Sequence, residues 1–229
     1  FQPFFINSLI SDIPHYRKIF TMKTKGRNVI IASLFILINA STSFGQQANK
    51  DGWVTLFDGK SLTDWKVGEH ASTFTVQDGA IVVFGERAHL FYEGSFKDHN
   101  FKNYEFKVNV MTTPGSNSGI FIDTEYQETG WPSKGYEVQV NQTHTDWRKT
   151  GSVYGIQDVK EVYVKDNEWY TEHIIVQGKR IIVKVNDKVI NDYTEGENGR
   201  LTGGTVALQG HDPKSKVYYK DIMLKVLPD

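Results

Sequence analysis

The chain has 229 residues, with 26 Lys and Arg against 27 Asp and Glu, and it contains no Cys. A formal charge near zero argues against a general nucleic-acid binder, because such proteins carry a basic excess. The lack of Cys excludes disulfides, thiolate zinc sites, iron–sulfur clusters and cysteine nucleophiles.

The first 45 residues carry the pattern of a secretory signal peptide behind an unassigned segment. Met22 opens a short basic stretch, an apolar run follows over 29–38, and small residues lead to Gly45. This run, which Ser33 interrupts, has ten residues and is too short to cross a bilayer, so we predict a signal peptide over 22–45 and no membrane span. No Cys follows the run, which excludes a lipoprotein anchor and predicts a periplasmic or secreted protein. Residues 1–21 have no role that we can assign, and we interpret them as a gene start placed too far upstream.

The predicted domain, residues 46–229, has about 184 residues and a net charge near −5. Helical periodicity is nearly absent, and short apolar or alternating runs between turn residues predict strands instead. The predicted strands are 53–57, 74–77, 80–84, 104–111, 119–123, 136–140, 169–176, 180–185, 188–192, 204–209 and 217–226. Turn residues at 77–79, 177–179 and 186–187 predict hairpins. So many short strands in one domain favour an all-β sandwich or barrel.

The tryptophans divide between predicted strands and a long loop-rich section over 124–168. We expect Trp53, Trp65 and Trp169 to lie in the core. Trp131, Trp147 and Tyr154 fall in the loop-rich section, where exposed rings could stack on sugars. Long connections in a compact domain are often functional.

Alternation along two predicted strands separates an apolar face from a face of directional polar groups. Glu137 and Gln139 share one face of their strand, and Gln209 and His211 share one face of theirs. A solvated outer face is the ordinary interpretation of such a pattern. Amides with one carboxylate and one imidazole are also typical of a sugar-binding face.

Residue types alone leave two further kinds of site possible, a metal site and a pair of catalytic carboxylates. No His-x-x-x-His or Asp-x-Asp-x-Asp pattern occurs, yet separated strands could bring Glu137 and His211 to a shared metal. Glu137 could instead pair with Glu125 or Glu128 of the nearby loop, as the two carboxylates of a glycosidase do.

Six segments in the same order resemble the 3-keto-disaccharide hydrolase domain family, of the type found in exported Bacteroidetes proteins. Residues 53–65 resemble its opening LF-(N/D)-G-x-x-L-x-x-W, 77–80 its D-G hairpin, 117–121 its N-S-G-I-F, 135–140 its G-Y-E-x-Q-(I/V), 150–155 its T-G-S-x-Y-G and 207–211 its L-Q-x-H. The sequence departs from the family at one place, because Asp123 stands where many members carry Arg. The next cations along the chain are Lys134 and the pair at 148–149.

The resemblance implies a concanavalin A-like jelly roll, in which two antiparallel sheets form a sandwich with a concave binding face. It also implies an exported hydrolase that cleaves 3-keto-disaccharides and other 3-keto-glycosides. A ketone acidifies the adjacent C–H bond, so a base can remove that proton and the glycosidic oxygen leaves by elimination. Addition of water then gives net hydrolysis. Such a site needs a base, an acid and donors for the enolate oxygen.

Motif position and strand alternation together give the candidate residues. Glu137 and His211 are the predicted acid–base pair. The predicted substrate-binding residues are Asn117, Gln139, Trp147, Lys149, Tyr154 and Gln209, with Lys149 and Tyr154 near the enolate. No cofactor is expected, although a divalent metal stays open. The expected partners are a carbohydrate substrate and an oxidoreductase that oxidises the sugar at C3.

Two other function classes remain open. A lectin-like carbohydrate-binding module uses the same fold and the same face without catalysis, because a fold does not fix a function. A two-carboxylate glycosidase or glucanase would act on sugars that have not been oxidised.

Overall fold

The computed structural model describes residues 48–229, and every structural statement below concerns these residues. The predicted signal peptide over 22–45 and the unassigned segment over 1–21 lie outside the described residues. In the described part, no helix has both the length and the apolar character needed to cross a membrane.

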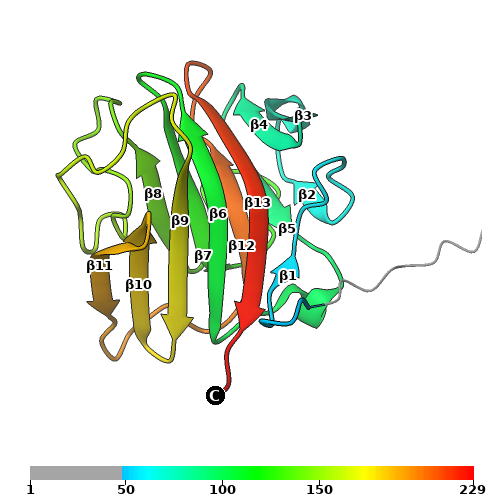
Figure 1. The fold of residues 1–229 in the computed structure, drawn as a ribbon, viewed down its shortest axis with the longest axis vertical. Coiled ribbons are helices and arrows are strands. Elements are labelled where there is room, and N and C mark those ends of the chain that lie inside the picture. Colours follow the sequence, from blue (N-terminus) through cyan, green and yellow to red (C-terminus); the bar gives the residue numbers. More distant parts are fainter. Residues whose placement is uncertain (1–47) are drawn as a thin grey trace, which may run out of the picture. The chain divides into compact units, whose positions relative to one another are not determined.

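Thirteen strands and two short 3-10 helices form the regular structure of the described part (Figure 1). In chain order they are β1 Val54–Thr55, β2 Trp65–Val67, η1 Ala71–Thr73, β3 Phe74–Gln77, β4 Ala80–Phe84, β5 Ala88–Tyr92, η2 Phe96–His99, β6 Tyr104–Thr112, β7 Asn117–Thr124, β8 Tyr136–Asn141, β9 Tyr170–Gln177, β10 Arg180–Val185, β11 Lys188–Thr194, β12 Thr205–Gly210 and β13 Lys216–Val226.

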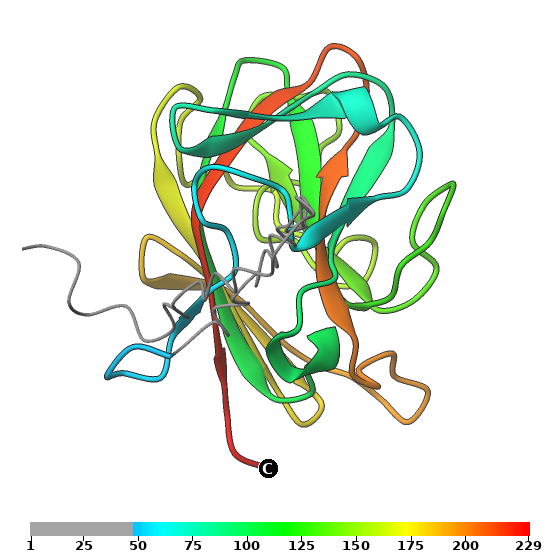
Figure 2. The ribbon, with the colours of Figure 1, turned by 90° about the vertical axis from the view of Figure 1, so that its right-hand side faces the viewer.

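The strands form two antiparallel sheets that pack face to face. The larger sheet has the order β11-β10-β9-β6-β13-β4-β3, with β1 paired to β13, and the smaller has the order β2-β5-β12-β7-β8. Figure 2 shows the two layers from the side, with β13 in one and β12 in the other. The prediction of an all-β sandwich of two antiparallel sheets is therefore confirmed.

The core between the sheets follows from strand alternation. Along β6, Tyr104, Phe106, Val108 and Val110 are fully buried, and the residues between them are only partly covered. In β5, β7 and β12, by contrast, residues on both faces are buried. The inward apolar side chains of the two sheets form one core cluster. Burial of one such side chain stabilises the fold by about 1.5–3 kcal/mol.

Two predicted hairpins have the backbone that their turn residues require. Asp78 and Gly79 join β3 to β4 with φ of 50° and 78°, and Asn186 and Asp187 join β10 to β11 with φ of 46° and 65°. Positive φ at both central residues matches the twist of the paired strands.

The sequence prediction failed at two strands and two tryptophans. The strands β2 and β5 were not predicted, because β2 is short and all five residues of β5 are buried, which removes the alternation. The placement of Trp169 in the core was wrong. Its neighbour Tyr170 takes the inner face, so Trp169 points outward and is 40% exposed. Trp65 is buried as predicted. The core prediction for Trp53 was also wrong, because its half-buried ring lies against His173 and the Lys107 ammonium on the outer face of the larger sheet.

Candidate active site

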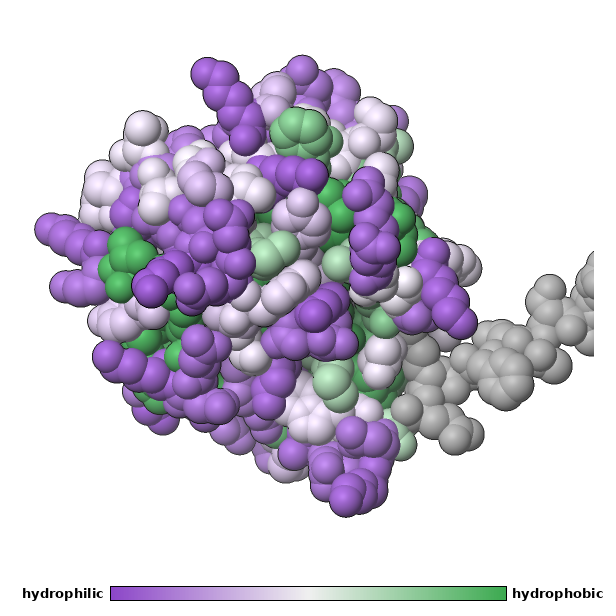
Figure 3. All heavy atoms as spheres, turned by 45° about the horizontal axis from the view of Figure 1, so that its top comes forward, coloured by the Kyte–Doolittle hydropathy of each residue, from purple (hydrophilic) through white to green (hydrophobic). Residues whose placement is uncertain are grey.

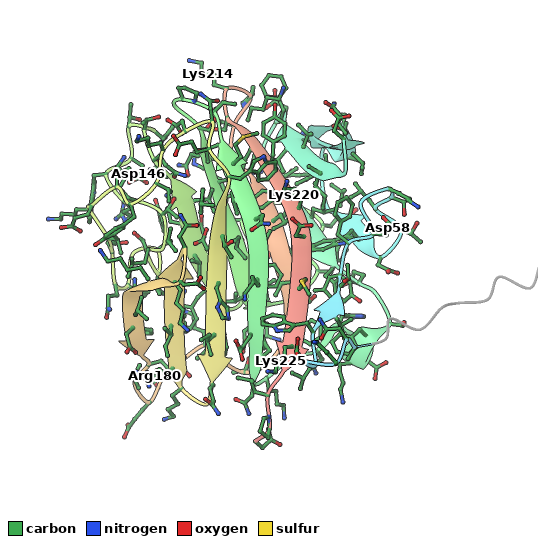
Figure 4. The ribbon with its side chains drawn as sticks, in the orientation of Figure 1. Asp58, Asp146, Arg180, Lys214, Lys220 and Lys225 are labelled. Atoms are coloured by element: carbon green, nitrogen blue, oxygen red, sulfur yellow. The ribbon has the colours of Figure 1, made fainter. Side chains whose placement is uncertain are left out.

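A cavity of about 440 Å³ opens on the face of the smaller sheet that is turned away from the core. Its lining comes from β7, β8, β12 and their adjoining loops: Asn117, Phe121, Trp131, Pro132, Gly135, Tyr136, Glu137, Gln139, Tyr154, Arg200, Gln209 and His211. Six of the eight predicted site residues therefore line one cavity, and Trp147 and Lys149 do not. Two loops near this face, after β8 and after β12, carry Asp146 and Lys214, both toward the top of Figure 4.

Glu137 is held in the cavity as a carboxyl group that retains its proton readily. Burial raises its pKa to about 7, the charge of Asp146 adds to the rise, and a hydrogen bond from Gln209 opposes it. The Gln209 Nε2 donates to Glu137 Oε1 over 2.9 Å. The neighbouring strand leaves room for this side chain at Gly119, where a Cβ would lie 2.8 Å from Glu137 Cγ. Glu137 can therefore act as a proton donor near neutral pH.

His211 is oriented by a carboxylate that follows it in the sequence. Its Nδ1 lies 2.7 Å from Asp212 Oδ2, which also accepts a hydrogen bond of 2.7 Å from Ser215 Oγ. Burial would raise the pKa of Asp212, but the hydrogen bonds from His211 and Ser215 hold it at about 2. The ionised Asp212 keeps the proton of a neutral His211 ring on Nδ1. Nε2 then has a free lone pair and can serve as a base.

Three buried amides on adjacent strands line the cavity with unpaired polar atoms. Asn117, Gln139 and Gln209 are each at most 2% exposed. In the described part, Asn117 Oδ1, Gln209 Oε1 and both polar atoms of the Gln139 amide have no hydrogen-bond partner. An unpaired buried polar atom costs about 1–3 kcal/mol, so these groups are poised to bind hydroxyls of a ligand.

Tyr154 forms the wall of the cavity beside Glu137. Its backbone N–H donates to the carbonyl of Glu137 over 2.9 Å, and its hydroxyl donates to Asp146 Oδ2 over 3.2 Å. Burial opposes ionisation of Asp146, but hydrogen bonds from the Arg148 N–H and the Tyr154 hydroxyl keep its pKa below the ordinary value. The ionised Asp146 is the charge that raises the pKa of Glu137.

The structure places the predicted residues Trp147 and Lys149 outside the cavity lining. The Lys149 Nζ donates to the carbonyls of His144 and Asp146 over 2.9 and 2.8 Å. Its ammonium thus holds the loop after β8 rather than facing a substrate. Trp147 is 47% exposed on the same loop.

A group of rings lies on the opposite side of the cavity, and sequence reasoning missed one of them, His89. Trp131 packs against His89 and His211, with ring centroids 5.5 and 5.6 Å apart. His89 lies opposite Gln209 on β5, is 2% exposed, and has an unpartnered Nε2. Burial, the charge of Arg87 and a smaller effect of His211 lower its pKa to about 4, so the ring is neutral. The alternation that would have revealed His89 is hidden, because β5 is buried on both faces.

The position where Asp123 departs from the family motif does not face the cavity. Asp123 Oδ1 accepts a hydrogen bond from the Tyr104 hydroxyl over 3.0 Å, and its Oδ2 accepts one from the Gly203 N–H over 2.8 Å. Burial raises the pKa of this carboxyl to about 6. A guanidinium reaches the cavity from another segment, because Arg200 of the β11–β12 loop lines it.

One group of side chains could offer donor atoms to a metal ion. One nitrogen each of His144 and His211 and an oxygen of Asp212 lie within 4.8 Å of one another. These groups are already engaged: Asp212 Oδ2 faces His211 and Ser215, and His144 Nδ1 accepts the N–H of Asp146 over 3.1 Å. A cation bound through the Nε2 atoms of the two rings would leave these hydrogen bonds in place, so a divalent metal stays open beside the histidine–aspartate pair.

Comparison with known sequences gives one family and one curated relative. Residues 52–225 match the model of a family described as 3-keto-alpha-glucoside-1,2-lyase-like domain. The 3-keto-disaccharide hydrolase of Bacteroides thetaiotaomicron is 28% identical over 170 residues, and the match covers 62% of this chain and 59% of that protein. The chain therefore spans about three fifths of the length of this relative.

Comparison with solved structures shows the same fold in carbohydrate-active proteins. A candidate glycosyl hydrolase of Parabacteroides distasonis has a TM-score of 0.68 at 22% identity, covering 80% of this chain and 99% of that one. The carbohydrate-binding module CBM66 of Bacillus subtilis has a TM-score of 0.53 at 9% identity, covering 71% and 96%. At these identities the likeness concerns the fold alone.

Proposed function

Because the chain belongs to the family of 3-keto-alpha-glucoside-1,2-lyase-like domains, we propose that it is an enzyme that cleaves the glycosidic bond of 3-keto-glycosides. The observation that carries the proposal is a base and an acid in one cavity: His211 held by Asp212, and Glu137 with a pKa raised to about 7. The relative named 3-keto-disaccharide hydrolase supports the same substrate class.

In the proposed reaction, His211 Nε2 removes the proton from C2 of the 3-keto sugar. The electron pair of that C–H bond forms the enediolate, and its collapse expels the glycosidic oxygen from C1. Glu137 gives its proton to the departing oxygen. Addition of water to the resulting double bond completes a net hydrolysis, and release without that addition is a lyase outcome.

The amides supply the remaining requirement of this chemistry, which is stabilisation of the enolate oxygen. The Gln139 Nε2 is a buried and unengaged donor in the described part, and it lies on the same face of β8 as Glu137. The unpartnered oxygens of Asn117 and Gln209 are acceptors for sugar hydroxyls. We therefore propose Gln139 as the enolate donor and the other two amides as hydroxyl ligands.

The proposed substrate also implies a partner reaction and a place of action. A 3-keto sugar arises by oxidation of the C3 hydroxyl, so an oxidoreductase that acts on sugars at C3 must supply it. The predicted signal peptide puts the reaction in the periplasm or outside the cell.

A carbohydrate-binding module is the second candidate function. The unpartnered amides and the fold shared with CBM66 favour it. A binder, however, requires neither a protonated carboxyl nor an oriented histidine. A two-carboxylate glycosidase is less well supported, because Glu137 is the one acidic residue among the cavity-lining residues of the described part.

The test is incubation of the protein with 3-keto-trehalose and with trehalose, followed by NMR. The proposal expects cleavage of the keto sugar and an intact trehalose. Binding of either sugar without cleavage would support the binding module, and cleavage of trehalose would support the glycosidase.

A further inference from the structure

A strip of aromatic and cationic side chains extends outward from the cavity on the side of Glu137. It begins at Tyr154, which lines the cavity and is 39% exposed, and continues through Arg148 to Trp147, which is 47% exposed. The Arg148 guanidinium lies 4.7 Å from the ring centre of Tyr154 and 4.8 Å from that of Trp147. One guanidinium therefore joins the cavity wall to the exposed indole.

The strip is held rigidly although it faces solvent. Arg148 Nε donates to Asp158 Oδ2 over 3.3 Å, and its Nη1 lies 3.6 Å from Asp146 Oδ1. The Asn141 Nδ2 donates to the carbonyls of Asp146 and Arg148, which flank Trp147. A fixed aromatic surface loses little conformational entropy when a ligand binds.

The chemistry of the cavity sets which part of a substrate meets this strip. The leaving oxygen must lie at Glu137, the proposed acid. Tyr154 is joined to Glu137 through a backbone hydrogen bond, and Asp146 acts on the pKa of that carboxyl. The base, His211, follows β12, which β7 separates from β8 in the sheet, and its ring packs against Trp131. The group that leaves with the oxygen therefore departs toward Tyr154.

We propose that Tyr154, Arg148 and Trp147 form a leaving-group subsite that takes a second pyranose ring, so that the enzyme prefers disaccharides to small alkyl 3-keto-glycosides. An indole packs against the C–H face of a pyranose, and the guanidinium offers N–H donors to its hydroxyls. This inference rests on the proposed function.

The experiment compares two substrates, 3-keto-trehalose and methyl 3-keto-α-glucoside, with the full chain. In Trp147→Ala, we expect kcat/KM for the disaccharide to fall about three- to tenfold, mainly because KM rises. The kcat/KM for the methyl glycoside should change far less. Trp147→Phe should restore most of the loss. Trp169→Ala is the matched control, because Trp169 is 40% exposed and has the Lys220 Nζ 4.1 Å from its ring centre, but it lies on the other sheet.

The outcomes separate this inference from the proposed function. A wild-type protein that cleaves neither keto sugar contradicts the proposed function itself. An active wild type whose preference between the two substrates is unchanged in Trp147→Ala contradicts the leaving-group subsite alone. A selective loss in Trp147→Ala that is absent in Trp169→Ala supports it.

Discussion

The outward faces of the two sheets carry similar residue types but differ in how their polar groups are paired. On the larger sheet, Asn109 donates to Asp221 over 2.8 Å and accepts from the Thr171 hydroxyl over 2.8 Å. On the smaller sheet, Gln139 is buried, and neither polar atom of its amide has a partner among residues 48–229. Lys220 and Lys225 of β13 and Arg180 of β10 lie on the larger sheet in Figure 4. The surface seen in Figure 3 is largely hydrophilic with scattered apolar patches.

Each face also carries a histidine–carboxylate pair, and the two pairs differ in their surroundings. His211 with Asp212 faces the cavity, whereas His173 Nε2 lies 2.8 Å from Glu105 Oε2 on the larger sheet. Burial and the charge of Lys107 lower the pKa of His173 despite Glu105. Similar pairs can thus differ in role, and we propose that the pair beside the cavity and its amides is the functional one.

The largest expected effect on kcat comes from replacing the proposed acid or the proposed base of the cavity. His211→Ala and Glu137→Gln should each lower kcat for 3-keto-trehalose by roughly 10²–10⁴-fold, because each removes a proton-transfer group. Glu105→Gln on the other face should leave kcat within about twofold. The measurement is steady-state kinetics, with thermal unfolding to show that each variant folds. Wild-type kcat in both cavity variants would contradict the assignment.

The next effect concerns the carboxylate that orients the base. Asp212→Asn presents an amide to His211 Nδ1 and favours the wrong tautomer, so kcat should fall on the order of 10²-fold or more. A purely structural role would lower stability without this loss. Kinetics at several pH values, beside a denaturant titration, distinguish the two, and an unchanged kcat would exclude the positioning role.

A smaller effect tests the unpaired amides. Gln139→Met removes two unsatisfied buried groups and keeps the side-chain length, so the free energy of unfolding should rise by about 1 kcal/mol while kcat/KM falls. Asn109→Leu on the larger sheet should instead lower stability, because Asp221 and Thr171 lose a partner. Urea titrations measure both changes. A less stable Gln139→Met protein would mean that Gln139 is already satisfied in the free protein.

The smallest effect concerns the inner face of the larger sheet, where Glu172 shares the core side of β9 with Tyr170 and Ile174. In the described part, Glu172 is fully buried and both its carboxyl oxygens lack partners. Burial raises its pKa well above the ordinary value of 4.5. The unfolded chain releases this proton above about pH 4.5 and the folded chain keeps it, so the free energy of unfolding falls as pH rises. Glu172→Gln should lose less stability between about pH 5 and pH 8 than the wild type. An equal pH dependence in both proteins would contradict this sign.

Strand alternation made much of the fold and part of the site predictable. Glu137 and Gln139 stand two residues apart on β8, so a sequence pattern places them on one face. Alternation also places Trp169 outside the core, because its neighbour Tyr170 points into it. The core prediction for Trp169 had relied on residue type and not on alternation. His89 could not be found in this way, because its strand is buried on both faces.

The remaining site residues depend on how loops close. Trp131 and Arg200 reach the cavity from connections that have no periodicity. Lys149 has the charge that an enolate would need, but two carbonyls of its own loop bind its ammonium. Asp212 follows His211 directly, yet only the turn that also brings Ser215 to it aims the carboxylate at the ring.

The most direct test of the assigned roles is hydrogen exchange at C2 of a 3-keto-glycoside in D₂O, followed by NMR. In Glu137→Gln the base remains and the acid is lost, so the C2 proton should exchange with solvent while the glycosidic bond stays intact. In His211→Ala neither exchange nor cleavage should occur above the uncatalysed rate. Exchange that persists in His211→Ala, or that is absent in Glu137→Gln, would contradict the division of acid and base in this cavity.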